Sequence, residues 1–260
     1  MEVKFQLKQR IEQAHRIVFL GGAGVSTASG LPDFRSDQTQ HRVQQHYGVS
    51  VETLLSYRYF YEQPEQVYDY LNTFLHLSSL KPNAAHRGLV CLEQKGYPLT
   101  IITQNIDGLH QAAGSHRVLE LHGNLRRFYC STCEKEYPLT HPVFEDAIPC
   151  CPDCLGNPRG QGLIRPDMVF YEEDLDEGVW FEARQAIAQA DLLIVAGTSL
   201  QVYPAAGLLE SFNGKDLVLI NTEPTRYDSK ATLVIREKVE HVLAYVSQAV
   251  KEKENKERCL

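Results

Sequence analysis

The stretch RIVFLGGAG, residues 16–24, decides the fold prediction for this chain. A run of β-branched and aromatic residues leads directly into a glycine-rich turn, an order typical of a parallel strand followed by a helix. Similar apolar runs occur at 98–105, 191–199, 216–221 and 231–236. Each is short and ends in a loop signal, as expected of strands that are buried on both faces of a parallel sheet.

Helical patterns separate these runs. Apolar residues recur at helical spacing over 82–95, 179–190 and 239–254. Because strand and helix patterns alternate, the sequence predicts an α/β fold with a Rossmann-like, doubly wound parallel sheet.

Two stretches interrupt this alternation. Residues 36–80 have a helical pattern but no strand, whereas residues 125–165 are rich in Cys, Pro and Gly and have little periodicity. We interpret both as insertions into the α/β core that pack together as a smaller inserted domain. The Rossmann-like domain then comprises residues 1–35, 81–124 and 166–260.

The composition is that of a globular protein. The 260 residues include 43% hydrophobic and 23% charged residues, which excludes a disordered chain. The net charge of −7 argues against a protein that binds nucleic acid by general charge. No apolar run approaches the roughly 20 residues that span a membrane, and the first ten residues lack the apolar region of a signal peptide. We therefore expect a cytoplasmic protein with no membrane partner.

Seven cysteines are present, and five lie between residues 130 and 154. An odd number without a secretion signal argues against a disulfide framework. The C-x-x-C pairs Cys130/Cys133 and Cys151/Cys154 are separated by 17 residues, which predicts one four-cysteine zinc site more strongly than a redox dithiol. Four thiolates leave no open coordination position, so the zinc is expected to be structural. We assign Cys150, which would give the wrong spacing, as a spare thiol.

The glycine-rich turn LGGAGVS, residues 20–26, is a candidate diphosphate site, because glycines allow close approach of the backbone to a ligand. The dinucleotide fingerprint is incomplete, since Thr27 occupies the third glycine position. The acidic ribose ligand expected about 20 residues later is also replaced, by Gln44 and Gln45. These departures disfavour an ordinary dehydrogenase, and a tight turn without a ligand is the alternative.

Polar residues follow the strand predicted at 98–103. Gln104, Asn105 and Asp107 are candidate ligand contacts, because ligands bind beyond the carboxyl ends of parallel strands. His110 and His122 are both candidates for a general base near neutral pH. Their positions in the sequence do not choose between them.

Together these residues resemble the sirtuins, the NAD-dependent protein deacylases, and especially the bacterial sirtuins. The matching segments occur in family order from Ile17 to Val246. They are GAGVSTASGLPDFRS (22–36), TQNIDGLH (103–110), the HG pair at 122–123, the two C-x-x-C pairs, GTSLQVYPAAGL (197–208) and INTEPT (220–225).

The resemblance implies a large Rossmann-like domain and a small domain made of a helical module, residues 36–80, and a zinc-ribbon module, residues 125–165. It also implies a set of site residues. The catalytic residues would be His122, as general base, with Asn105 and Asp107. Val169, Phe170 and Tyr171 would pair with an extended acylated peptide by β-augmentation. NAD would contact Gly22, Ala23, Gly24, Thr27, Phe34, Arg35, Gln104, Asn105, Ile106, Asp107, His122, Gly197, Thr198, Ser199, Asn221, Thr222 and Val239.

The implied reaction consumes NAD. The carbonyl oxygen of acetyl-lysine attacks the ribose carbon that bears nicotinamide, and His122 then removes a proton from a ribose hydroxyl. Nicotinamide, O-acetyl-ADP-ribose and free lysine result. No Tyr-x-x-Arg pair follows Arg35, so we expect removal of acetyl or another small acyl group. Ala28, residues 37–41 and the segment after Cys154 depart from the usual family pattern.

Two alternatives are kept. The first is transfer of ADP-ribose to a protein, which uses the same activation of NAD. The second, from a different class, is a zinc-ribbon module that binds nucleic acid through Arg126, Arg127, Phe128 and Tyr129. The acidic net charge weighs against the second, and no direct nucleic-acid partner is expected.

Overall fold

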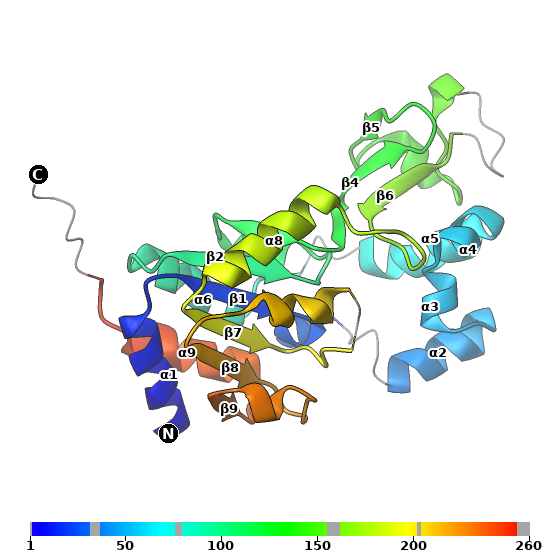
Figure 1. The fold of residues 1–260 in the computed structure, drawn as a ribbon. Coiled ribbons are helices and arrows are strands. Elements are labelled where there is room, and N and C mark those ends of the chain that lie inside the picture. Colours follow the sequence, from blue (N-terminus) through cyan, green and yellow to red (C-terminus); the bar gives the residue numbers. More distant parts are fainter. Residues whose placement is uncertain (1, 32–36, 76–79, 155–161, 202–203, 254–260) are drawn as a thin grey trace, which may run out of the picture.

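Six parallel strands form the central sheet, in the order β3-β2-β1-β7-β8-β9 (Figure 1). The computed structural model describes residues 2–31, 37–75, 80–154, 162–201 and 204–253. The strands are β1 (Ile17–Gly21), β2 (Leu99–Thr103), β3 (Val118–Glu120), β7 (Leu192–Ala196), β8 (Asp216–Ile220) and β9 (Leu233–Ile235). The predicted doubly wound sheet is confirmed, and the short strand β3 is added at one edge.

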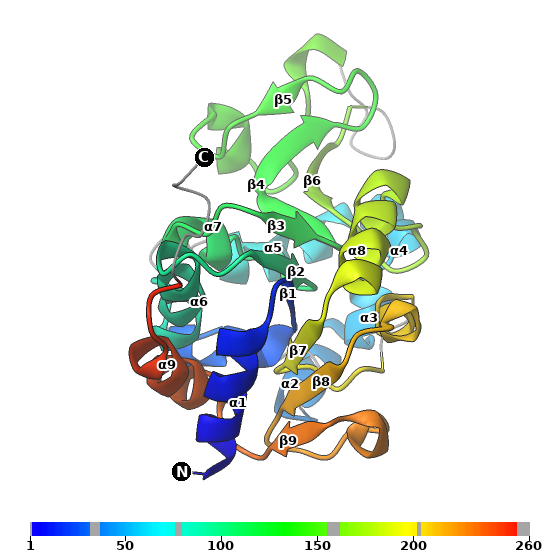
Figure 2. The ribbon, with the colours of Figure 1, turned by 60° about the vertical axis from the view of Figure 1, so that its left-hand side comes forward.

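Helices cover both faces of this sheet (Figure 2). One face packs against α1 (Glu2–Gln13), α6 (Ala84–Gln94) and α9 (Val239–Ala249). The opposite face packs against α8 (Glu177–Gln189) and the 3₁₀ helix η6 (Ala205–Ser211). Strand residues alternate between the two cores, which explains why β1 is apolar at every position before its terminal glycine.

The last helix is shorter than the sequence predicts. It ends at Ala249 rather than near residue 254, because Val250 is already extended. The chain that follows bonds to other segments: the Lys251 carbonyl accepts from the Tyr97 hydroxyl at 3.0 Å, and the Lys253 N–H donates to the Lys95 carbonyl at 2.9 Å. These tertiary bonds replace the next helical turn.

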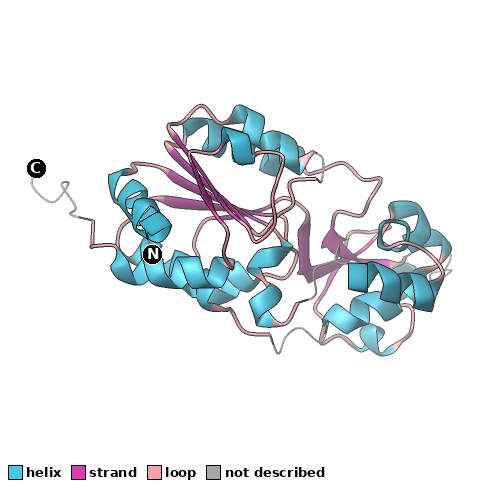
Figure 3. Cartoon of the chain, turned by 90° about the horizontal axis from the view of Figure 1, so that it is seen from below, coloured by secondary structure: helices cyan, strands magenta, loops and turns pink. Residues whose placement is uncertain are grey.

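A second group of elements lies beyond one end of the sheet (Figure 3). Within the segment predicted as helical, the helices are α2 (Asp37–Tyr47), α3 (Val51–Leu54), α4 (Tyr57–Glu62) and α5 (Pro64–Leu75). Ser50 and Ser56 cap the helices α3 and α4. These helices share a core with Leu125 and Leu163, so the two interrupting stretches pack together.

The cysteine-rich stretch contains a three-stranded antiparallel sheet in the order β5-β4-β6. Its strands are β4 (Gly123–Cys130), β5 (Glu136–Tyr137) and β6 (Ile164–Met168). The small sheet therefore extends slightly beyond residues 125–165 at both ends. The remaining elements are α7 (Leu109–Ala113), η1 (Ala23–Val25), η2 (Thr27–Ser29), η4 (Pro142–Glu145), η5 (Pro152–Cys154) and η7 (Asp228–Lys230).

Among the described residues, no helix combines the length and the apolar composition that crossing a membrane requires.

Candidate active site

A cavity of about 290 Å³ lies where the large sheet meets the second group of elements. It opens at the carboxyl ends of β1, β2 and β7. From β1, the strand order runs through β2 and β3 to one edge of the sheet, and through β7, β8 and β9 to the other edge. Ligands of open α/β sheets bind at such a switch point.

Eleven of the residues singled out in the sequence line this cavity. They are Ala23, Gln104, Asn105, Ile106, His122, Val169, Phe170, Tyr171, Gly197, Thr198 and Ser199. Further lining residues were not among the predicted site residues: Val51, Leu55, Met168, Glu172, Glu173, Leu175 and Pro204. Val51 and Leu55 come from the helical segment, and no local signal in the sequence marks them as site residues.

The glycine-rich turn after β1 packs directly against the turn after β7. The Gly24 N–H donates to the Gly197 carbonyl at 2.8 Å, and the Gly22 N–H donates to the Ala196 carbonyl at 3.1 Å. A Cβ on Gly24 would lie 2.8 Å from the Gly197 Cα, closer than real contacts allow. Glycine is thus required here for the approach of the two turns to each other.

His122 is oriented by the backbone. Its Nδ1 lies 2.9 Å from the Gln104 carbonyl oxygen. Since a carbonyl oxygen only accepts hydrogen bonds, Nδ1 carries the proton in this arrangement. Nε2 is then the ring nitrogen with the lone pair, as a general base requires.

His110, the other candidate base, belongs to the core. Its ring is 1% exposed and lies 4.7 Å from the ring of His86. Burial, together with the neighbouring His86, lowers the pKa of His110 to about 3. Burial also lowers the pKa of His86 to about 4. Both rings are neutral near pH 7, and neither lines the cavity.

A hydrogen-bonded chain joins the turn after β1 to the end of β2. The Asn105 side-chain amide donates to the Ser26 hydroxyl at 3.0 Å, and that hydroxyl donates to the Asp107 carboxylate at 2.7 Å. The second Asp107 oxygen accepts the Leu109 N–H at 2.8 Å. The Asn83 amide adds a bond to the Val25 carbonyl at 2.7 Å. These bonds hold Asn105 and Asp107 beside the glycine-rich turn.

Gln104, which lines the cavity, has one buried side-chain donor without a partner in the described part of the chain. Its Oε1 accepts from the Thr198 hydroxyl at 3.3 Å, whereas its buried Nε2 has no partner among the described residues. Leaving an amide N–H₂ buried without an acceptor is costly. A ligand that offers hydroxyl or carbonyl oxygens would satisfy it, and the ribose and carboxamide groups of NAD fit that requirement.

Within the part of the chain that the structure describes, the other predicted NAD contacts lie outside the cavity lining. Gly22, Gly24, Thr27 and Asp107 belong to the turn and loop described above. Asn221 and Thr222 follow β8, and Val239 begins α9 with 3% exposure. Phe34 and Arg35 lie outside the described residues.

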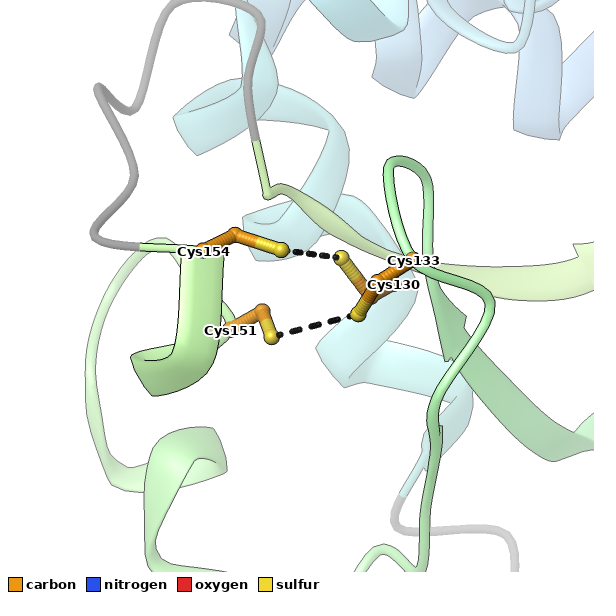
Figure 4. A group of neighbouring side chains, drawn as sticks. All are labelled: Cys130, Cys133, Cys151 and Cys154. Carbon is orange, nitrogen blue, oxygen red and sulfur yellow. Dashed lines mark hydrogen bonds between the residues drawn. The ribbon is translucent and has the colours of Figure 1, made fainter.

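The four predicted zinc ligands converge (Figure 4). The sulfur atoms are 3.6 Å apart in Cys130 and Cys154, and 3.7 Å apart in Cys133 and Cys151. A tetrahedral zinc ion with Zn–S bonds of about 2.3 Å separates its sulfur ligands by about 3.8 Å, so the cluster fits zinc. The Tyr137 hydroxyl donates to the Cys151 sulfur at 3.0 Å and orients that ligand.

The basic residues considered for nucleic-acid binding are paired within the protein. Arg126 forms an ion pair with Glu120, and Arg127 forms ion pairs with Glu136 and Asp167. The Phe128 side chain is fully buried. Strand β4, which carries these residues, therefore lacks the combination of unpaired positive charge and exposed aromatic rings that nucleic-acid binding requires.

Comparisons with known proteins agree on one family. The model of the Sir2 family matches residues 22–204. An NAD-dependent protein deacetylase of Cutibacterium acnes is 46% identical, over 94% of this chain and 98% of the relative. Two solved structures, a Sir2 protein with a p53 peptide and NAD⁺ and a Sir2 protein with an acetylated peptide, superpose with TM-scores of 0.82 and 0.81. They are 37% and 36% identical, and each alignment covers 95% of this chain and 98% of the solved chain.

Proposed function

Because the chain belongs to the Sir2 family and is an NAD-dependent protein deacetylase, we propose that the cavity at the carboxyl ends of β1, β2 and β7 is its active site. The observation that carries this assignment is the His122 ring, which lines the cavity with its Nδ1 bonded to the Gln104 carbonyl. Membership of the family agrees with the resemblance to the sirtuins noted in the sequence.

NAD is proposed to bind along the turns after β1 and β7. When bound, it supplies a ribose carbon whose bond to nicotinamide breaks during the reaction. The unpartnered Gln104 amide donates to the ligand, while Asn105 and Asp107 are held in place through Ser26. The proposed contacts are Gly22, Ala23, Gly24, Thr27, Phe34, Arg35, Gln104, Asn105, Ile106, Asp107, His122, Gly197, Thr198, Ser199, Asn221, Thr222 and Val239.

His122 is proposed as the general base. Its Nε2 takes a proton from a ribose hydroxyl of the ligand, and the resulting positive charge is stabilised by the bond from Nδ1–H to the Gln104 carbonyl. The apolar lining residues Val51, Leu55 and Ile106 suit a small neutral acyl group and exclude water from the reacting atoms.

The acylated peptide is proposed to bind along residues 169–172. The Tyr171 backbone is already used, because its N–H donates to Leu55 and its carbonyl accepts from Tyr57. The Val169 N–H donates to the His122 carbonyl. Among the described residues, no bond involves the Val169 carbonyl or the Glu172 N–H, which leaves one acceptor and one donor for β-augmentation by a peptide.

The domain division follows from this assignment. We propose that residues 1–35, 81–124 and 166–260 bind NAD, and that residues 36–80 and the zinc-binding residues 125–165 form the smaller domain. The core that α3, α4 and α5 share with Leu125 and Leu163 supports the smaller domain.

We further propose a cytoplasmic location. The four sulfur atoms that converge on one site are free cysteines rather than disulfides, as zinc binding requires. Fractionation of the source cells tests the location: recovery with cytoplasmic marker enzymes is expected, and recovery elsewhere would contradict it.

Replacement of His122 by Ala tests the proposed base. General-base catalysis typically contributes about 10²–10⁴-fold, so His122→Ala should lower kcat for an acetyl-lysine peptide by that factor. Zinc content and the unfolding temperature should not change. His116→Ala is the matched control, because His116 is an exposed histidine outside the cavity. Near-normal turnover by His122→Ala would contradict the role of His122.

A further inference from the structure

The substrate-facing wall of the cavity is a short segment with little regular structure. Residues 169–172 run between β6 and α8, and only one isolated bridge, between Ser56 and Tyr171, involves them. The Glu173 N–H donates to the Phe170 carbonyl at 3.2 Å and closes a turn. Within this turn Glu172 has a φ of 77°, a conformation that favours glycine. Neighbouring groups must therefore hold this segment in its conformation.

An ion pair spans the turn from both sides. The Arg165 guanidinium donates to the two Glu173 carboxylate oxygens at 2.7 Å each, and it also donates to the Met168 carbonyl at 3.1 Å. Glu173 Oε2 in addition accepts the Phe170 N–H at 2.9 Å. The two side chains therefore bond to the residues on each side of Val169.

Arg165 is the buried member of the pair, whereas Glu173 is partly exposed, with 21% of its side chain accessible. Arg165 is 7% exposed. Burial by itself would lower the pKa of Arg165, but its hydrogen bonds to Glu173 and the charge of that carboxylate outweigh burial and raise the pKa. A bidentate pair of this kind fixes geometry more strictly than a single charge contact does.

Aromatic contacts connect the pair to both parts of the small domain. The Arg165 guanidinium lies 5.7 Å from the ring of Tyr129, on β4, and 5.1 Å from the ring of Phe170. Phe170 in turn stacks on Phe60 of α4, with the ring centroids 4.9 Å apart. Phe170 also lines the cavity. The small sheet, the helical segment and the cavity wall thus meet at this ion pair.

We propose that Arg165 and Glu173 are positioning residues for the acyl-lysine substrate. By clamping the turn at residues 170–173, they keep the Val169 carbonyl and the Glu172 N–H in the arrangement that an extended peptide requires. This inference rests on the proposed binding of an acylated peptide along residues 169–172.

This Arg165–Glu173 ion pair, the clamp, should affect the binding of the peptide and not the binding of NAD. The turns that would hold NAD are joined by their own bonds, such as that from the Gly24 N–H to the Gly197 carbonyl, and none of those bonds involves the clamp. Loosening the clamp should therefore raise KM for the peptide and leave KM for NAD unchanged. A general loss of folded protein would instead lower the apparent kcat and leave KM for the peptide and KM for NAD unchanged.

Two variants test the clamp. Arg165→Lys keeps the positive charge but lacks the planar fork that reaches both oxygens and the Met168 carbonyl. Arg165→Met combined with Glu173→Leu removes both charges, so that no buried charge is left unpaired. Arg10→Lys is the matched control, because the Arg10–Asp216 ion pair of 2.8 Å lies at the amino end of β8, away from the cavity, and is also partly buried.

The readouts are KM for an acetyl-lysine peptide, KM for NAD, the Kd of a fluorescently labelled acetyl-lysine peptide, zinc content and the unfolding temperature. For both clamp variants we expect the peptide KM and Kd to rise roughly tenfold, below the about hundredfold effect that a 1 Å displacement can cause. KM for NAD should stay at the wild-type value. Arg10→Lys should leave KM for the peptide and KM for NAD at their wild-type values.

Two results would overturn the inference. The first is a wild-type peptide KM and Kd in Arg165→Lys together with a lowered unfolding temperature, which would show a purely structural ion pair. The second is an equal rise of both KM values. If the double variant does not fold, the peptide KM and Kd of Arg165→Lys alone test the inference. Absence of peptide turnover by the wild-type protein would instead contradict the proposed function.

Discussion

Acid should destabilise the protein through two buried histidines that take no part in the proposed reaction. His86, on α6, and His110, on α7, pack ring against ring in the core. The His86 Nδ1 accepts the Asn83 N–H at 3.3 Å, whereas both His110 nitrogens lack partners among the described residues. A proton on His110 would therefore introduce a buried charge without a partner in the described part of the chain, and a proton on His86 would be offset only in part, by the charge of Asp107.

The magnitude follows from proton linkage. An unfolded histidine titrates near pH 6.5. In the native state the pKa of His110 is about 3 and that of His86 about 4. Between these values the unfolded chain binds more protons than the native protein, so stability falls as the pH falls. Lowering the pH from 7 to 5 should cost about 2 kcal/mol of unfolding free energy for each ring.

A double comparison isolates this contribution. The unfolding free energies of wild type, His110→Asn and His116→Asn are measured by urea denaturation at pH 7 and pH 5. Titration of other groups, including the zinc-binding thiols, is common to all three proteins and cancels. His110→Asn should be less stable than wild type at pH 7, and the difference should shrink by about 2 kcal/mol at pH 5. His116, whose side chain is 84% exposed, is the control. The difference in unfolding free energy between wild type and His116→Asn should be the same at both pH values.

An unchanged difference between wild type and His110→Asn at the two pH values would refute this reasoning. It would mean that His110 titrates normally in the native protein, either because water reaches the ring or because the core opens readily.

Two further predictions concern the metal and the glycine-rich turn. Cys130→Ser removes one of four converging sulfur ligands and should lower both the zinc content and the unfolding temperature, measured by metal analysis and thermal denaturation; full zinc content would contradict the assignment. Gly24→Ala places a Cβ 2.8 Å from the Gly197 Cα and should raise KM for NAD about tenfold by separating the two turns, because small displacements at a binding site are costly. An unchanged KM for NAD in steady-state kinetics would count against the proposed NAD site.

The parts of the fold that depend on local pattern could be predicted from the sequence. The apolar run before Gly21 indicates a buried parallel strand because it lacks polar alternation, and the spacing of the two C-x-x-C pairs predicts the sulfur cluster directly. Strand β3 was not predicted, since its three half-buried residues carry too little signal. The early end of α9 depends on bonds to Lys95 and Tyr97, which are distant in the sequence.

The candidate site could be predicted only in part. Gln104 and Asn105 follow the end of a predicted strand, where fold rules place ligands, whereas His122 follows β3, which was not predicted. The choice between His110 and His122 needed tertiary structure, because burial depends on which helices cover each ring. Val51 and Leu55 belong to another segment and reach the cavity only through packing of the helical segment against residues 169–173.

The most direct test of the central claim is to follow one acetyl-lysine peptide and NAD through the reaction by mass spectrometry. We predict that free lysine peptide, nicotinamide and O-acetyl-ADP-ribose form in equal amounts, and that no deacetylation occurs without NAD. Deacetylation in the absence of NAD would contradict the account. Release of nicotinamide with the acetyl group retained and ADP-ribose attached to protein would contradict it as well, in favour of ADP-ribosyl transfer.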